Sequence, residues 1–328
     1  MFSIIRTINK HRTVSVELLL DLFDKMILPI AMYNSEVWGM NLIPTNLNNN
    51  AFFSSKNLSN TNVEGLQYKF VKLILGLHSK ASNWAVLSET GRYPIVIKVF
   101  MAMIKYLFHL NNAPSKILHA ALAVNMGLAR DGYMSWFKSI VRILKFCNLE
   151  HLLYTIDIKE IDFQVRNLKK NLQALYTNVW KSERLNFQTD SKLDLFTALK
   201  KDFGISDYLR SLTISPHRMA ITKFRVSAHR FPIEIGRYLG IHREDRMCPF
   251  GCNKIGDEQH YLLQCSHPFL INTRNPLIAT IFILNPHLVA MARKAQCHFL
   301  LSNTDPKNLE LVGKLCYQIQ SIFKEITT

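Results

Sequence analysis

Acidic residues, glycine and proline are scarce in this chain of 328 residues. It has 24 Asp and Glu against 40 Lys and Arg, which leaves a net charge of +16, and only 12 Gly and 11 Pro. The shortage of Gly and Pro, together with an apolar fraction of 48%, excludes a disordered or low-complexity chain. The shortage of acids predicts polyanionic partners, either nucleic acid or an anionic membrane surface.

Long uninterrupted apolar runs are missing as well. The longest are broken by charged residues, for example by Asp24 and Lys25 or by Lys98 and Lys105. None reaches the roughly 20 clean apolar residues that a bilayer span needs, and the first residues lack the apolar block of a signal peptide. We therefore expect no membrane partner and an intracellular location, in the nucleus or the cytoplasm.

Six cysteines are too dispersed to form a disulfide framework. Three of them, Cys147, Cys297 and Cys316, lie in apolar stretches with helical spacing, where we expect buried packing thiols. The other three fall close together near residue 250. Free thiols in both settings favour a reducing compartment.

Helical periodicity dominates the chain. Apolar residues recur every three or four positions in several segments, with charged residues on another face. The predicted helices cover residues 14–33, 63–77, 94–110, 133–146 and 161–184. Sustained alternation of period two and Asn-Gly hairpin turns are both lacking. The sequence therefore predicts an all-α protein.

Two of these helices contain expected interruptions. Pro29 should kink or end the helix at 14–33, because proline has no amide hydrogen, and Gly76 is placed to terminate the helix at 63–77. Between them, residues 41–62 include eight asparagines. Such side chains compete with regular backbone hydrogen bonding, so this stretch is predicted to be a linker or a long loop.

Four metal-ligand side chains lie within eighteen residues, in the pattern Cys248-x3-Cys252-x7-His260-x4-Cys265. Thiolates and imidazole are ligand types that zinc prefers, and four protein ligands close a structural site. The pattern predicts a structural Zn²⁺ ion held by Cys248, Cys252, His260 and Cys265. The alternative is two local cysteines beside an unrelated histidine and cysteine, and His267 is a substitute ligand to consider.

The backbone must leave the helical path to bring these ligands together. On an unbroken helix, positions 260 and 265 would point about 140° apart. The helix should therefore unwind before position 265, with Pro268 enforcing a stop. Asp257 or Glu258 is placed to orient the imidazole from outside the metal site.

A basic segment precedes the metal motif. Ser215 and Pro216 suit the N-cap and first position of a helix, and Pro232 should stop it. From Arg210 to Arg246 there are eight basic against three acidic residues, a net charge of +5. At helical spacing, one side consists of Ala220, Ile221, Phe224, Ala228 and Phe231. Another side consists of Arg218, Arg225 and His229.

Basic side chains of this segment are candidates for contacts with nucleic-acid phosphates, which orient a strand without reading its sequence. For any single arginine, an ion pair with a local carboxylate on a solvated face is the commoner role. Three acids cannot neutralise eight bases, so the cluster as a whole favours binding to RNA or DNA. The predicted phosphate contacts are Arg218, Lys223, Arg225, Arg230, Arg237, Arg243 and Arg246.

Two parts of the chain carry motifs of a known family. Residues 221–265 include RVSAHRFPIEIGRY, RMCPFGC and DEQHYLLQC, and residues 22–39 read LFDKMILPIAMYNSEVWG. These segments resemble the region near the C-terminus of non-LTR (LINE-type) retrotransposon reverse transcriptases, and residues 63–94 are similar as well. Asn34 stands where the family usually has Gly, and Phe231 where it often has Leu. The matching positions near the metal motif are Arg225, His229, Ile233, Glu234, Gly236, Arg237, Tyr238, Arg246, Cys248, Cys252, Asp257, Glu258, His260 and Cys265.

The resemblance implies a thumb-like helical bundle that follows a polymerase palm, then a basic helix and a CCHC module that helps to hold element RNA or target DNA. We expect a thumb-like region at 1–112, a helical middle region at 113–210, the basic helix and zinc module at 211–270, and a C-terminal helical region at 271–328. The family's polymerase centre needs paired aspartates, and no Asp-Asp pair occurs in this chain. The expectation is a nucleic-acid-binding fragment that is not itself an enzyme.

Other catalytic motifs, such as HExxH and GxSxG, are also lacking. The lone carboxylates Glu36 and Glu234 are expected to pair with arginine in buried positions. Two alternatives stay open: a zinc-stabilised protein-interaction module that docks on a partner or on a palm-containing chain, and one part of a split polymerase completed in trans. A region cut from a larger polymerase should expose an apolar face along residues 22–38.

Overall fold

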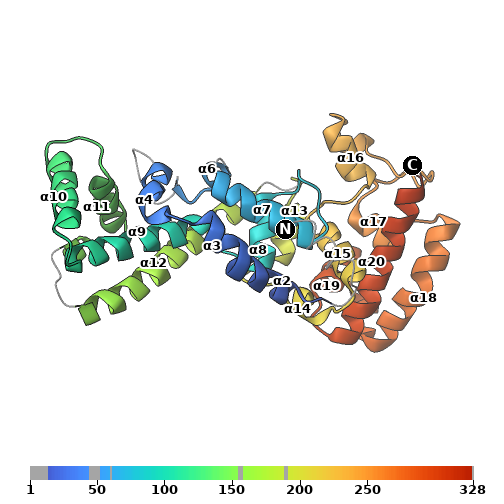
Figure 1. The fold of residues 1–328 in the computed structure, drawn as a ribbon. Helices are drawn as coiled ribbons and strands as arrows, with labels where there is room; N and C mark the ends of the chain where they lie inside the picture. Colours follow the sequence, from blue (N-terminus) through green and yellow to red (C-terminus); the bar gives the residue numbers. More distant parts are fainter. Residues whose placement is uncertain (1–13, 44–51, 60, 154–157, 188–190, 327–328) are drawn as a thin grey trace. The chain divides into compact units, whose positions relative to one another are not determined.

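The computed structural model describes residues 14–43, 52–59, 61–153, 158–187 and 191–326. Over these residues the chain is mostly helical and contains no strand (Figure 1). Extended pairing is limited there to two isolated β-bridges, Thr90 with Ile205 and Met247 with Ile255. The all-α prediction is confirmed.

Contacts between residues divide the chain into two compact units. Unit 1 comprises the described parts of Met1–Leu22, Lys69–Arg92 and Phe187–Thr328, and unit 2 comprises those of Phe23–Tyr68 and Tyr93–Asn186. The four consecutive regions expected from the sequence do not coincide with these units. Each unit combines segments that are far apart in the chain, which sequence order alone does not reveal.

Unit 2 is organised around one long buried helix. Its elements are η1 (Phe23–Ile27), α3 (Leu28–Ala31), α4 (Ser35–Trp38), η2 (Gly39–Leu42), α6 (Ser55–Leu58), the first part of α7 (Asn62–Ile74), α9 (Ile95–Asn112), α10 (Lys116–Arg130), α11 (Trp136–Phe146), η3 (Glu150–Leu153) and α12 (Ile158–Leu185). Helix α9 packs against α4, α10, α11 and α12. Its apolar face, including Val99, Met103 and Leu107, is buried as the spacing predicts. At its first turn, the carboxylate of Glu64 accepts a hydrogen bond from the amide of Val96 at 2.9 Å.

The Asn-rich stretch is only partly a loop. Residues 44–51 and 60 lie outside the described residues, but 55–58 form the short helix α6. Phe52 and Phe53 just before it are buried, with ring centroids 5.3 Å from Phe100 and 5.9 Å from Tyr176, respectively. Two adjacent aromatic side chains thus bring part of the stretch into the core, because their burial outweighs the local preference of Asn and Ser for turns.

The predicted helix at 14–33 is interrupted, as expected, but the proline plays a different part. Helix α2 (Val16–Leu22) is followed by the wider π-turn η1, and α3 then begins with Pro29 in its first two positions. A proline at a helix start loses no hydrogen bond, since that amide would have no intrahelical partner. Pro29 therefore opens a helical segment rather than ending one.

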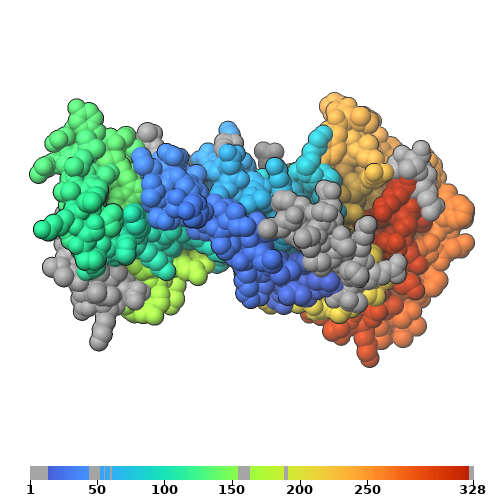
Figure 2. Space-filling model, in the orientation of Figure 1, coloured from blue at the N-terminus to red at the C-terminus, as the bar shows by residue number. Residues whose placement is uncertain are grey.

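An apolar face along residues 22–38 is exposed, in agreement with the sequence prediction. Met26, Ile30, Tyr33 and Val37, spaced by three or four residues, all have more than half of their surface exposed. The segment is part of the blue surface in Figure 2. Exposed apolar faces of this kind are uncommon on isolated domains and indicate association.

Unit 1 contains the metal motif and the basic segment. Its elements are α2, the end of α7, α8 (Asn83–Thr90), α13 (Asp194–Leu199), α14 (Asp207–Ser211), α15 (Ser215–Arg225), α16 (Pro232–Tyr238), η4 (Arg243–Asp245), α17 (Glu258–Leu263), α18 (Pro268–Leu284), η5 (Pro286–Ala290), α19 (Arg293–Ser302) and α20 (Pro306–Ile326). Helix α20 packs against both α15 and α18 (Figure 1). Ile221 and Phe224 of α15 and Leu315 and Ile319 of α20 are fully buried there.

The predictions for the remaining helices and cysteines are confirmed. Helices α7, α9, α11 and α12 begin and end within three residues of the predicted bounds, and Gly76 follows the end of α7 with a φ of 66°. All six cysteines are free, and Cys147, Cys297 and Cys316 are buried. Burial raises the pKa of the Cys147 thiol to about 12, as expected for an inert packing side chain. Among the described helices, no single one is long and apolar enough to cross a membrane.

Candidate metal centre and nucleic-acid interface

The first two cysteines of the motif lie on a tight turn. The amide of Cys248 donates to the carbonyl of Lys254 at 2.8 Å, beside the isolated bridge between Met247 and Ile255. Gly251 within this turn has a φ of 73°, a conformation that glycine adopts without a steric penalty. The turn directs both thiols to the same side.

The third ligand, His260, lies within α17, and the fourth, Cys265, lies two residues beyond the end of this helix. Asp257 caps this helix by accepting a hydrogen bond from the amide of His260 at 2.7 Å. The helix ends at Leu263, and the amide of Cys265 turns back to the carbonyl of His260 at 2.8 Å. The helix therefore unwinds before Cys265, as predicted. Pro268 is not the cause, because it starts α18 instead.

These elements bring the four predicted ligands together. One ligand atom from each of Cys248, Cys252, His260 and Cys265 lies within 4.8 Å of the others. The sulfur of Cys265 is 3.9 Å from that of Cys248 and 3.6 Å from that of Cys252. Tetrahedral zinc with Zn–S bonds of about 2.3 Å requires sulfur atoms about 3.8 Å apart. The observed separations bracket that value and are far longer than a disulfide bond of about 2.05 Å.

His260 is in the state that a metal ligand needs. Both ring nitrogens are buried, and neither has a hydrogen-bond partner among the described residues. Burial, followed by the charges of Lys254 and Arg274, lowers the pKa of this imidazole to about 4. The ring is thus neutral at pH 7 and can offer a lone pair. A buried, unpartnered imidazole beside three thiols fits a structural zinc ion.

The thiols differ in how readily they ionise. Burial raises the pKa of Cys265 to about 12. For Cys252, hydrogen bonds with Ser266, Cys265 and Cys248 outweigh burial and lower the pKa to about 7. Because zinc binds thiolates, metal binding at this cluster must release protons, and Cys252 is the thiol that most easily provides the first thiolate.

Two suggested supporting roles around the cluster are wrong. Neither Asp257 nor Glu258 contacts the ring of His260: Asp257 caps α17, and Glu258 faces His229 at 2.7 Å. His267, considered as a substitute ligand, is not among the residues whose ligand atoms meet, and its ring lies tilted against Phe250 with ring centroids 4.1 Å apart. The metal cluster therefore consists of the four residues of the motif.

The basic helix is shorter than predicted and begins differently. Its N-cap is Ile214, with Ser215 as the first helical residue, and it ends at Arg225 rather than at Pro232. Ser227 has a positive φ of 49°, which turns the chain away from the helix. Pro232 then opens α16. The apolar side predicted for this segment is buried throughout.

Arg218 does not face solvent, contrary to the prediction. Only 1% of its surface is exposed. Its guanidinium donates to the carbonyl of Leu212 at 2.8 Å, and to the carbonyl of Val14 and the hydroxyl of Ser215 at 3.0 Å each. This side chain ties the start of α15 to α2 and α14 instead of contacting a phosphate.

Arg225 is also buried, with 4% of its surface exposed. It donates to the carboxylate of Glu89 on α8 at 2.6 Å and also to the carbonyl of Leu301. The other carboxylate oxygen of Glu89 accepts a hydrogen bond from Ser206. The arginine side of α15 is therefore a second buried face. The carboxylate that pairs with Arg225 is 136 residues away in the chain, so helical spacing cannot reveal it.

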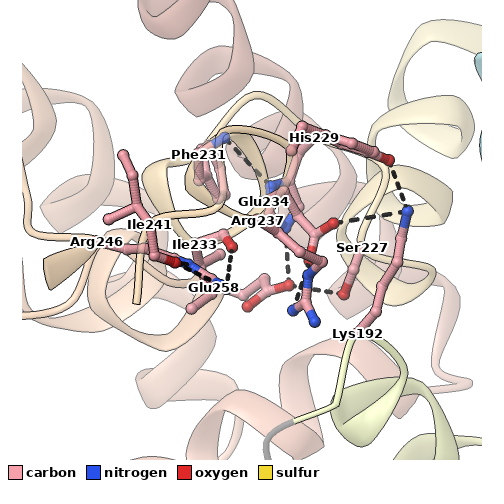
Figure 3. A network of polar contacts seen from close by, with 11 residues as sticks. Lys192, Ser227, His229, Phe231, Ile233, Glu234, Arg237, Ile241, Arg246 and Glu258 are labelled. Carbon is pink, nitrogen blue, oxygen red and sulfur yellow. Dashed lines mark hydrogen bonds and ion pairs between the residues drawn. The ribbon is translucent and has the colours of Figure 1, made fainter. Parts of the chain in front are cut away.

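Arg237 and Arg246 belong to a polar network that supports the module (Figure 3). Arg237 donates to Glu234 at 3.2 Å, and Lys192 lies 3.6 Å from the same carboxylate. The predicted buried pairing of Glu234 is confirmed. Arg246 donates to the carbonyl of Ile241 at 2.8 Å and to that of Ile233 at 3.0 Å, which holds the chain just before the first cysteine.

The histidine of the basic segment completes this network. His229 is buried, and its Nδ1 accepts a hydrogen bond from the amide of Phe231 at 3.3 Å. Its Nε2 therefore carries the proton and donates to Glu258 (Figure 3). Ser227 donates to the same carboxylate at 3.1 Å. The serine is bonded to the acid and not to the histidine, so this group lacks the pairing that activates a nucleophile.

The other three predicted phosphate contacts are Lys223, Arg230 and Arg243. They belong neither to the buried pair Arg218 and Arg225 nor to the network of Arg237 and Arg246. Arg230 is exposed, whereas Lys223 and Arg243 are half-buried. Lys223 and Arg230 line one cavity together with His78 and Lys324, two bases that the sequence analysis did not select. Because these residues lie in separate parts of the chain, no local pattern could have grouped them.

Comparison with protein-family models, with curated proteins and with solved structures gives no match for this chain. The resemblance to LINE-type reverse transcriptases therefore rests on the motif residues alone and stays a prediction.

Proposed function

We propose that this chain is a nucleic-acid-binding region of a LINE-type reverse transcriptase, organised by a structural zinc ion. The observation that carries the proposal is the meeting of Cys248, Cys252, His260 and Cys265 within 4.8 Å, directly after a basic segment. The zinc ion would fix the turn and α17, and it would thereby position η4 and α16 with their arginines. No catalytic step is assigned to the zinc ion, because four protein ligands leave no open position.

Charge supports a nucleic acid as the partner. The chain carries a net charge of +16, and Arg230, Lys223 and Arg243 retain exposed or half-exposed basic groups near the metal module. Such side chains bind phosphates of RNA or DNA and release condensed counterions. Both polymers remain partners under this proposal, as does a chain that contains the polymerase palm.

Arg243 provides a direct test. The full chain, prepared with zinc, would be titrated into a labelled single-stranded oligonucleotide and followed by fluorescence anisotropy. We expect Arg243→Gln to weaken binding several-fold, whereas Lys314→Gln, which removes an exposed charge on α20, should leave it nearly unchanged. Equal affinities of both variants and the wild type would contradict the proposed interface.

A second function, docking on another protein, is favoured by one specific observation. Met26, Ile30, Tyr33 and Val37 form an exposed apolar face in unit 2, and such faces usually mark interaction sites. A protein-interaction module would keep the zinc site as a purely structural element and would need no phosphate contacts. The same titration, repeated at several salt concentrations, separates the two functions. An interaction module predicts no salt-dependent binding to the oligonucleotide.

A further inference from the structure

Tyr238 exposes an aromatic ring next to the metal module of unit 1. Of its surface, 50% is exposed, and no other described aromatic ring packs against it. It is the last residue of α16, and Gly240 just beyond it has a φ of 70°, which turns the chain away from the helix. The ring therefore stands at the end of a helix, where a planar group can approach it.

Two lysines from distant segments of unit 1 converge on this ring. The ammonium of Lys80, in the loop between α7 and α8, lies 5.2 Å from the ring centroid. The ammonium of Lys192, which precedes α13, lies 5.3 Å from the centroid and donates to the Tyr238 hydroxyl at 2.9 Å. A cation bonded to the hydroxyl lies toward that edge of the ring. Lys192 therefore does not cover the centre of the ring.

The two lysines differ in their partners. Lys192 also lies 3.6 Å from the carboxylate of Glu234 (Figure 3), so it orients the tyrosine and its charge is already balanced. Lys80 is exposed and forms no ion pair with a described carboxylate. A contact between an exposed cation and an aromatic ring is weak. Lys80 is therefore able to turn toward a phosphate at small cost.

The surroundings of Lys80 are positive. Burial lowers the pKa of His78, and the charges of nearby lysines lower it further: Lys192, Lys72, Lys223 and Lys80. Burial, followed by the charge of Lys192, lowers the pKa of Lys72 to about 8. No carboxylate is among the causes of either shift. This part of unit 1 therefore attracts anions.

Contacts with the metal module fix α16 and hence the position of the ring. Arg246, just before the first cysteine ligand, donates to the carbonyl of Ile233 in the first turn of α16 at 3.0 Å. The amide of Ile233 donates to the carbonyl of Gly256, between the second and third ligands, at 3.2 Å. An added Cβ on Gly236 would lie 2.6 Å from Cγ of Arg246, so α16 and this arginine are in close contact. The turn that zinc would stabilise therefore holds α16 in place, and with it Tyr238.

We propose that Tyr238 and Lys80 bind one nucleotide of a single strand, with its base stacked on the tyrosine ring and a neighbouring phosphate on Lys80. An exposed ring beside an unpaired cation matches both parts of a nucleotide, and stacking accepts any base. The bases of a duplex are already stacked on one another and are not offered in this way. The inference rests on the proposed function and deepens it, because it names a single strand as the form of nucleic acid that is bound.

The first experiment tests the ring. The full, zinc-loaded chain would be titrated into labelled oligothymidylate, and binding would be followed by fluorescence anisotropy. We expect Tyr238→Ala to weaken binding about tenfold, the scale of losing one base stacked on an aromatic side chain. Tyr238→Phe keeps the ring and should bind as the wild type does. So should Tyr133→Ala, which removes an exposed tyrosine of unit 2.

The second experiment separates stacking from charge by means of an abasic strand of the same length. Tyr238→Ala should bind this strand as the wild type does, because no base remains to stack. Lys80→Gln should weaken binding of both strands and reduce the steepness of log affinity against log salt by about 0.7. Lys314→Gln, which removes an exposed charge on α20, is the control. Because Lys80 is exposed, its variant keeps the test valid even if Tyr238→Ala does not fold.

The outcomes distinguish this site from the proposed function. Salt-dependent binding of oligothymidylate that is indifferent to Tyr238→Ala and Lys80→Gln would overturn the site and leave the proposed function standing. An equal loss on the abasic strand for Tyr238→Ala would overturn the stacking. A wild type that binds no oligothymidylate would overturn both the site and the proposed function.

Discussion

Arg225 and Glu89 form a buried ion pair that joins α15 to α8. Both side chains are almost inaccessible to water, and their nearest atoms are 2.6 Å apart. Removing one partner leaves the other charge buried and unpaired, which costs about 3–5 kcal/mol. We therefore expect Arg225→Ala to lower the free energy of unfolding by that amount, measured by urea denaturation.

The exposed pair of Arg210 and Glu17 is the matched control. Its side chains are 53% and 55% exposed, at a separation of 2.8 Å. Solvent-exposed pairs contribute less than about 1 kcal/mol, so Arg210→Ala should have a small effect. Similar losses for Arg225→Ala and Arg210→Ala would show that Arg225 is not the buried link that the structure places there.

The metal ligands allow a second prediction for single residues. Cys265→Ser removes a buried sulfur from the cluster, and we expect zinc content to fall from one ion per chain to a small fraction. Stability should drop on the order of 4 kcal/mol, the scale of losing a structural metal. Cys297→Ala, a buried thiol outside the cluster, should retain the zinc ion. Equal zinc content in both variants, measured by elemental analysis after dialysis, would rule out the predicted ligand set.

The contrast between these residues shows what the sequence could reveal. The metal ligands were predictable because all four lie within eighteen residues and zinc restricts the ligand types. The roles of Arg218 and Arg225 were not, because their partners include Val14, Glu89 and Leu301. A helical projection separates apolar from basic positions, but it does not show whether a second buried surface covers the basic ones.

Helices were predicted well where apolar periodicity is long, and poorly where prolines set the boundaries. Pro232 and Pro268 were each interpreted as a stop, and Pro29 as a kink or a stop, yet each lies in the first two positions of a helix. Proline at a helix start sacrifices no hydrogen bond and already has the required φ angle. The same local sequence around a proline is compatible with the end of one helix and with the start of the next. Tertiary packing therefore decides which of the two forms.

One glycine at the end of α8 gives a prediction for this element. Gly91 has a φ of 62°, and an added Cβ would lie 2.6 Å from the backbone nitrogen of Ile205 and 2.8 Å from the carbonyl carbon of Gly204. The left-handed conformation alone costs a residue with a side chain about 1–2 kcal/mol. Because the clash is with backbone, Gly91→Ala should destabilise the protein by more than about 2 kcal/mol in chemical denaturation.

Gly127 is the control, because it lies inside α10 and an added Cβ would meet nothing within 4 Å. Alanine in a helix interior is more favourable than glycine by about 0.5–1 kcal/mol. Gly127→Ala should therefore stabilise the chain slightly. If Gly91→Ala were equally well tolerated, the close packing of α8 against the loop at 204–205 would be incorrect.

At the scale of the whole molecule, the exposed apolar face predicts self-association. Ile30→Glu should reduce the aggregated fraction in sedimentation velocity, with little change in the free energy of unfolding, because the side chain is exposed. Ile27→Glu, on the same segment but buried, should destabilise the fold instead. Equal solubility of Ile30→Glu and the wild type at high concentration would indicate that this face is not an association surface.

The division into two units was the part of the fold that the sequence could not predict. Composition and periodicity indicate helices, but the grouping of 14–22 and 69–92 with the C-terminal half depends on long-range contacts. The same contacts bury Arg218 and Arg225 and gather Lys223, Arg230 and Lys324 at one cavity. Fewer of the seven predicted bases are therefore accessible than the sequence suggested, because Arg218 and Arg225 are buried in unit 1.

Binding of a single-stranded oligonucleotide, measured over a series of salt concentrations with and without zinc, tests the central proposal most directly. If Lys223, Arg230 and Arg243 each contact one phosphate, log affinity should fall with log salt with a slope of about −2. Removal of zinc with a chelator should abolish this binding, because the module then loses the turn that positions its arginines. A flat salt response, or binding that is unchanged without zinc, would contradict a zinc-organised nucleic-acid-binding function.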